Sequence, residues 1–134
     1  MTRLVTFVDV DDDVAHPRRI SVSARHEAVL TSGRRVLLLD DRGWTESGPP
    51  NIWAMTSVED IVDTARVVVG PDEPFGGRSH KQMETDHWTR LAEVLRRREV
   101  VVDGPELRLL PHDVVLSERL LARLGSEPGD AIQQ

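Results

Sequence analysis

The segment ISVSARHEAVLTSGRRVLLL, residues 20–39, carries the clearest structural pattern in the chain. From Ile20 to Leu30 the even positions are mainly apolar and the odd positions mainly polar. This alternation predicts a strand with one buried face. Thr31-Ser32-Gly33 predicts a hairpin turn, and 35–39 predicts a returning strand that is apolar on both faces and therefore central.

The first of these two strands has two unusual features. Eleven residues are long for one strand, so we expect a bend or bulge near Arg25 and His26. His26 also stands alone on the apolar face. A single histidine in that position indicates a satisfied core residue more often than a ligand.

Further strands are predicted on either side of this hairpin. The apolar run from Leu4 to Val10 predicts a buried strand. Residues 40–43 (DDRG) predict another turn. Ile52 to Met55 predicts a last short strand before the helical half of the chain.

Helix starts dominate the second half of the sequence. Thr56 with Glu59, and Ser79 with Gln82, have the spacing of capping boxes. Apolar residues then recur at helical spacing, which predicts helices over 57–69 and 80–98. A third helix is predicted over 114–124, either capped by Asp113 or restarting at Ser117, and 100–102 predicts a short extended piece.

The predicted fold class is therefore α+β. An antiparallel sheet of about four strands would come from the N-terminal half (3–55), covered on one face by three C-terminal helices (56–125). Strands followed by helices, without βαβ alternation, argue against a doubly wound parallel sheet. We expect one domain over 1–125 and a disordered tail over 126–134.

Composition excludes several classes of chemistry. The chain has 134 residues, no Cys and a net charge of −6. Thiolate zinc sites, cysteine nucleophiles and disulfides are thus ruled out. The charge argues against nucleic-acid binding, because phosphate backbones require a positive surface. No signal peptide or membrane span is recognisable, so the expected location is cytoplasmic.

A metal site is one candidate for chemistry. His80, Glu84 and His87 lie at about 0°, 40° and −20° around the predicted helix and so share a face. Two imidazoles and a carboxylate can bind zinc or a similar divalent ion, although the spacing is not that of the zincins. The simpler interpretation, which we favour, is a helix start with an exposed His80, a solvated Glu84 and a packing His87.

An anion site is the second candidate. Gly77, Arg78 and Ser79 bring free backbone amides, a guanidinium and a hydroxyl to a helix N-terminus, which suits a phosphate or carboxylate. The spacing is not that of a P-loop. The alternative interpretation is a connector whose glycines and prolines only form turns, and we favour it.

Three phrases of the chain resemble small conserved actinobacterial proteins of unassigned function. They are ARHEAVLTSGRRVLLLDDRGW (24–44), VVVGPDEPFGG (67–77) and LPHDVVLSERLLARL (110–124). The resemblance covers most of the chain. It implies a single fold and a bacterial cytoplasm, and it carries no activity or site residues.

Two functions follow as hypotheses. The first is a non-catalytic protein-binding or regulatory module of the immunity or accessory type, since no catalytic motif is complete. Residues 56–134 carry a charge of −5, which would steer a basic partner. A homo-oligomer is also possible, and no cofactor is expected. The second hypothesis is a small metal-dependent enzyme or anionic-ligand-binding protein with its site at the start of helix 80–98.

Overall fold

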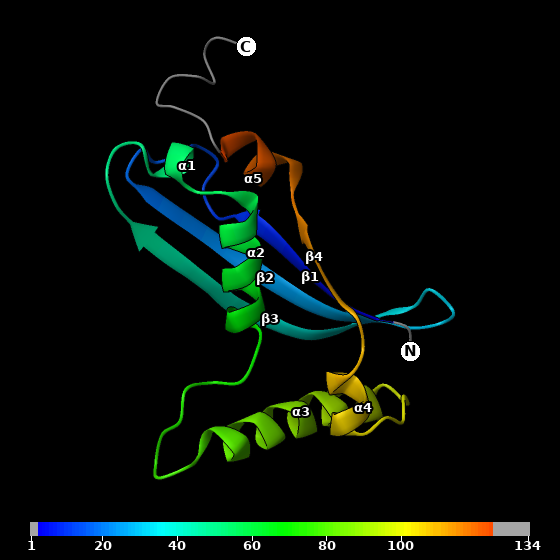
Figure 1. Cartoon of the computed structure of the whole chain (residues 1–134). Coiled ribbons are helices and arrows are strands. Elements are labelled where there is room, and N and C mark those ends of the chain that lie inside the picture. Colours follow the sequence, from blue (N-terminus) through cyan, green and yellow to red (C-terminus); the bar gives the residue numbers. More distant parts are fainter. Residues whose placement is uncertain (1–2, 125–134) are drawn as a thin grey trace.

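The computed structural model describes residues 3–124 as an α+β fold built on a four-stranded sheet (Figure 1). The predicted tail over 126–134 lies outside the described residues. The sheet has the order β3-β2-β1-β4, and its strands are β1 (Arg3–Val10), β2 (Arg19–Val29), β3 (Arg35–Ser47) and β4 (His112–Leu116). The β1–β2 and β2–β3 pairs are antiparallel, whereas β1 and β4 are parallel.

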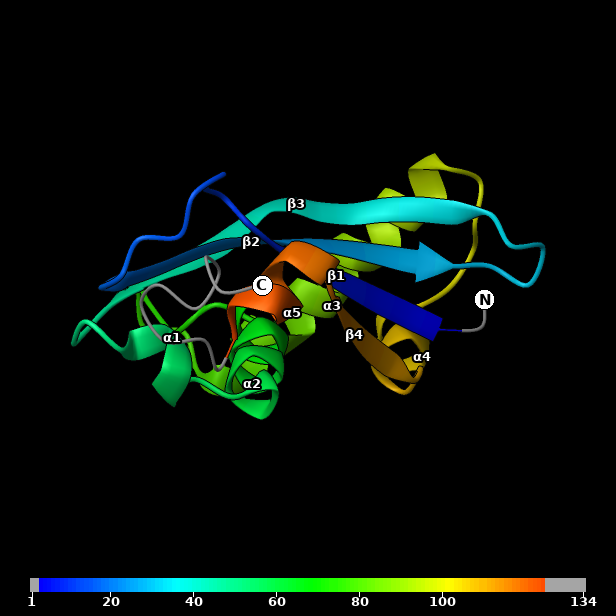
Figure 2. The ribbon, with the colours of Figure 1, turned by 90° about the horizontal axis from the view of Figure 1, so that it is seen from above.

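The helices pack on one face of this sheet. They are α1 (Ile52–Met55), α2 (Val58–Val68), α3 (His80–Arg97), α4 (Gly104–Arg108) and α5 (Glu118–Arg123). Even-numbered side chains of β1 and β2 contact both the α1–α2–α5 group and the α3–α4 pair. Figure 2 shows α1 and α2 together on one side of the strands.

The fourth strand is where the predicted topology was wrong. Residues 112–116 form β4, not the start of a helix, and β4 pairs with the free edge of β1. Val114 and Val115 are β-branched and favour this extended conformation. The helix restarts at Ser117, whose hydroxyl accepts a hydrogen bond from the Leu120 amide and caps α5. The sheet is therefore mixed, and one of its strands comes from the C-terminal half.

Two shorter predictions were also wrong. Ile52 to Met55 is helical. The consecutive side chains Ile52 and Trp53 are both buried, whereas a strand with one buried face would expose one of them. Trp53 Nε1 also donates to the His16 carbonyl at 2.8 Å. Residues 100–102 form no strand, and α4, which the sequence did not predict, follows with Asp103 as its N-cap.

Local signals in β2 and α3 were well placed. Register shifts between Ala24 and Glu27 confirm the predicted irregularity in β2. The capping box of Ser79 and Gln82 is confirmed. The other capping box is shifted by one residue, to Ser57 and Asp60, so α2 begins at Val58.

The core is divided into two clusters. The upper cluster lies under α1, α2 and α5, and the lower cluster lies under α3 and α4. The upper cluster is Val8, Val10, Ile20, Val22, Ile52, Trp53, Ile61, Ala65 and Leu120. The lower cluster is Leu4, Ala28, Val36, Leu38, Leu91, Leu95 and Leu107. Between Leu4 and Val8 on β1 lies Thr6, so a polar position separates the two clusters.

The predicted turn at 40–43 is instead the middle of β3. Arg42 pairs with Ala24, and Gly43 pairs with Ser23. A Cβ atom added at Gly43 would lie 2.6 Å from the carbonyl oxygen of Val22. The glycine is thus required for close strand approach and not for a turn.

We expect Gly43→Ala to destabilise the protein by about 1–3 kcal/mol, because the added methyl must push β2 and β3 apart. Chemical denaturation followed by circular dichroism measures this. Asp41→Ala, at an exposed neighbouring position, is the control and should change stability by less than about 0.5 kcal/mol. Equal stability of the two variants would show that the sheet accommodates a side chain at position 43.

Candidate functional site

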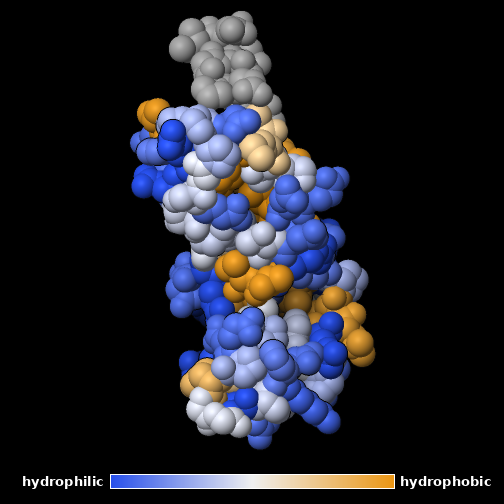
Figure 3. Space-filling view, turned by 60° about the vertical axis from the view of Figure 1, so that its left-hand side comes forward, coloured by the Kyte–Doolittle hydropathy of each residue, from blue (hydrophilic) through white to orange (hydrophobic). Residues whose placement is uncertain are grey.

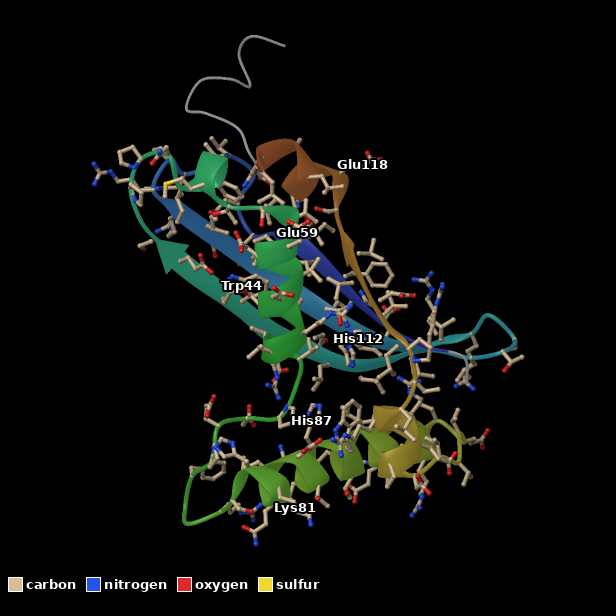
Figure 4. The ribbon with its side chains drawn as sticks, viewed as in Figure 1. Trp44, Glu59, Lys81, His87, His112 and Glu118 are labelled. Carbon is tan, nitrogen blue, oxygen red and sulfur yellow. The ribbon has the colours of Figure 1, made fainter. Side chains whose placement is uncertain are left out.

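Four polar side chains lie between the two core clusters, and we call them the histidine seam: Thr6, His26, His87 and His112. The four come from β1, β2, α3 and β4 respectively. Thr6, His26 and His112 are in contact, and His87 is near enough to His26 to lower its pKa. Figure 4 shows His87 between the lower end of α2 and α3, and His112 beside the lower half of α2, near β4. Residues more than a hundred positions apart are joined here by the parallel pairing of β1 with β4.

Thr6 links two of the imidazoles. Its Oγ1 lies 2.8 Å from His26 Nδ1 and 2.6 Å from His112 Nε2. The two rings are in edge-to-face contact, with centroids 5.0 Å apart. A hydroxyl has only one proton to donate, so at least one of the two imidazoles donates an N–H to Thr6.

The seam is uncharged at neutral pH. Burial, helped by the neighbouring His112 and His87, lowers the pKa of His26 to about 3. Burial, and then the charge of Arg42, lowers the pKa of His87 to about 4. The pKa of His112 is also lowered, first by burial and then by Arg66. Neutral imidazoles can pass protons or accept them, which is the chemistry of a general base.

Access limits what the seam can do. Thr6, His26 and His87 are 0%, 1% and 8% exposed. His87 Nε2 is buried and makes no hydrogen bond within residues 3–124. A general base must come within hydrogen-bond reach of its substrate, and these groups face packed protein. Thr6, His26 and His87 therefore form a polar layer of the interior, whereas His112 is only partly buried.

The predicted metal residues are placed differently from one another. His80 is exposed at the start of α3. Glu84 Oε1 forms an ion pair with Arg108 Nε at 2.9 Å, on the side of α3 that faces α4. His87 belongs to the buried seam. In the described part of the chain, no three His, Asp or Glu side chains form a group that could hold a metal ion.

The predicted anion residues have partners of their own. Gly77 adopts a positive φ of 76°, as a turn requires. Arg78 forms an ion pair with Asp86. Ser79 accepts a hydrogen bond from the Gln82 amide as the cap of α3. The anion site at the helix start stays a prediction, and in the structure these three residues form a well-capped connector.

Two surface hollows were not predicted. The α3–α4 groove has a volume of about 420 Å³, and residues from both helices line it, among them Trp88, Gly104, Pro105, Arg108 and Leu109. A Cβ atom at Gly104 would lie 3.1 Å from Trp88 Cβ, so the glycine lets α4 pack closely on α3. The segment DGPELRLL, with its Asp-Gly-Pro helix start, was the signal for this helix.

The arginine pocket is the second hollow, and it has a volume of about 570 Å³. It lies where the β2–β3 hairpin meets the end of α3. Its lining is Arg25, Glu27, Arg34, Arg35, Val36, Leu37 and Arg98. The sequence shows the basic pairs and runs that contribute to it, but gives no sign that 34–35 and 98 are neighbours.

Comparison with known proteins gives no functional lead. No protein-family model, no curated protein and no solved structure matches the chain. Within residues 3–124, no helix is long and apolar enough to cross a membrane. Figure 3 shows one face of the molecule, which is largely hydrophilic with separate hydrophobic patches.

The histidine seam predicts that stability falls in acid. The unfolded chain protonates its histidines near pH 6.5, whereas folded His87 resists protonation until about pH 4. The free energy of unfolding that depends on neutral, buried histidines is fully present above pH 6.5. It is lost as the pH falls toward 4, by up to about 1.4 kcal/mol per pH unit for each such histidine. Between pH 7 and 5, we expect the free energy of unfolding of His87→Leu to fall by about 2 kcal/mol less than that of the wild type.

Denaturant unfolding at several pH values measures this difference. His80→Leu is the matched control, because His80 is exposed, and it should keep the wild-type pH profile. Parallel stability curves for wild type and His87→Leu would contradict the assignment of His87 as a buried neutral group.

The predicted metal site has a direct check in elemental mass spectrometry of untagged protein. If His80, Glu84 and His87 bind a divalent ion, the native protein carries about one equivalent, and His87→Ala loses it because the site loses a ligand. His16→Ala is the control for nonspecific uptake on an exposed histidine. Equal metal content in wild type and His87→Ala would exclude this site.

Proposed function

We propose that this chain is a non-catalytic protein-binding module, and that the α3–α4 groove is its contact surface. The observation that supports this is a hollow lined by a highly exposed leucine. Leu109, which lines the groove, is 84% exposed. Exposed apolar surface beside a formed groove is typical of interaction sites.

The groove has the features of a protein contact site. Trp88 lies in it beside Pro105, giving a rigid apolar surface, while Lys81 and the Glu84–Arg108 ion pair line it as charged groups. An apolar centre with charged surroundings is the usual anatomy of such an interface.

Charge indicates the kind of partner. The net charge of −6 favours encounter with a protein of positive net charge. The apolar groove would then supply the affinity, and the charge the rate of association. The burial of Thr6, His26 and His87 supports a binding role over catalysis, because these groups serve the interior.

Leu109→Asp tests the proposal. Burying a leucine side chain contributes about 1.5–3 kcal/mol, so the variant should weaken partner binding by roughly 10- to 100-fold. Affinity capture from a native lysate, quantified by mass spectrometry, compares the proteins retained by wild type and variant. Val14→Asp is the matched control, because Val14 is 81% exposed in the loop between β1 and β2.

The expected result is a protein that wild type and Val14→Asp retain and that Leu109→Asp loses. The same retained set for all three chains would contradict the proposal. Sedimentation of the purified proteins separates a further case: a wild-type dimer that Leu109→Asp dissociates would assign the groove to a second copy of this chain.

A further inference from the structure

We propose that the arginine pocket binds a small molecule carrying a phosphate monoester. The pocket has four arginines and one glutamate, so it carries a charge of +3 in a chain of net charge −6. It lies apart from the α3–α4 groove and shares no lining residue with it. The inference therefore stands independently of the proposed protein-binding role.

Glu27 organises the pocket from within. Its side chain is buried, with 9% of it exposed. Its Oε2 lies 2.8 Å from Arg25 Nε, and its Oε1 lies 3.7 Å from Arg35 Nη1. Arg35 also lies over the Phe7 ring, 5.2 Å from its centroid. The buried carboxylate thus holds Arg25 through Oε2, whereas its Oε1 has no hydrogen-bond partner within residues 3–124. Holding one guanidinium in place before a ligand arrives lowers the entropic cost of binding.

Arg34 and Arg98 are the two guanidiniums that remain available. Both are exposed, and neither forms an ion pair with any residue between 3 and 124. They come from the β2–β3 hairpin and from the end of α3, and they face the same hollow. Unneutralised charges on two separate elements suit a ligand group with two negative charges.

The chemistry of the side chains favours phosphate. A guanidinium presents its N–H donors as a planar fork, which matches two oxygens of one phosphate. A phosphate monoester has three terminal oxygens and a charge near −2, so it can accept from two forks at once. A single carboxylate has two oxygens and one charge, which satisfies only one of them.

The rest of the pocket indicates a small organic body. Its volume of about 570 Å³ is far larger than a phosphate group, and it lies in the range of small-molecule sites. Leu37 is a partly exposed apolar side chain next to the arginines, and Val36 borders the pocket from the core. The buried Glu27 and the net negative charge of the chain oppose a long phosphate backbone, so a compact monoester fits better than a nucleic acid.

Isothermal titration calorimetry with phenyl phosphate tests the proposal. Saturable one-to-one binding is expected, and benzoate, which has the same ring and a single charge, should bind at least about tenfold more weakly. Inorganic phosphate should also bind more weakly, because it leaves the apolar lining uncovered. Arg34→Gln and Arg98→Gln should each weaken phenyl phosphate binding by about tenfold or more.

Arg18→Gln is the matched control. Arg18 is exposed in the loop between β1 and β2. The Arg18→Gln variant removes the same charge from the chain, so it should bind phenyl phosphate with wild-type affinity. Circular dichroism confirms that each variant is folded. The proposal is overturned if wild type shows no saturable binding, if benzoate binds as well as phenyl phosphate, or if Arg18→Gln weakens binding as much as Arg98→Gln.

Two additional measurements separate the alternatives. Leu109→Asp changes the α3–α4 groove and should bind phenyl phosphate with wild-type affinity. The phosphate proposal and the protein-binding proposal can therefore fail independently of each other. A thymidine oligonucleotide that binds more tightly than phenyl phosphate, and loses affinity in Arg34→Gln, would assign the pocket to nucleic acid and overturn the monoester.

Discussion

The parallel pairing of β1 with β4 is the constraint on which the rest of the structure depends. It joins Leu4–Val8 to 112–116, two segments more than a hundred residues apart. The Ser117 amide donates to the Val8 carbonyl at 2.9 Å, and Arg119 pairs with Asp9 at 2.8 Å. These contacts fix where α5 begins, and with it one end of the upper core cluster. Without this pairing, β1 would be an unprotected edge.

The same pairing creates the histidine seam. It brings His112 to Thr6, which already faces His26 across the β1–β2 pair. Two imidazoles hydrogen-bonded to Thr6 thus lie between two apolar clusters, with His87 near them. Thr6, His26 and His112 tolerate few alternative packings, because a displaced member would lose its hydrogen bond. The seam contains three of the five histidines, of which His26 and His87 are buried and His112 is partly buried.

Helix α3 connects the interior to the surface. One face contributes His87, Leu91 and Leu95 to the seam and the lower core. Another face forms the α3–α4 groove through Trp88, and Arg98, which ends the helix, lines the arginine pocket. The two proposed binding surfaces therefore share one support. The helix start at Ser79, where metal and anion sites were weighed against a simple helix start, caps this element.

Local patterns were sufficient to predict the α+β class, the β2–β3 hairpin, the irregularity near Arg25 and the helices α2 and α3. Each of these depends on alternation, helical spacing or capping within a few residues. The pattern could not reveal β4, because Val114 and Val115 suit a strand only when an edge is free beside them. Gly43 likewise matched a turn pattern in the sequence, because the close approach of Val22 on the neighbouring strand is a long-range contact. The seam and the arginine pocket depend on long-range contacts between strands and helices, and local sequence carries no record of which distant residues will meet.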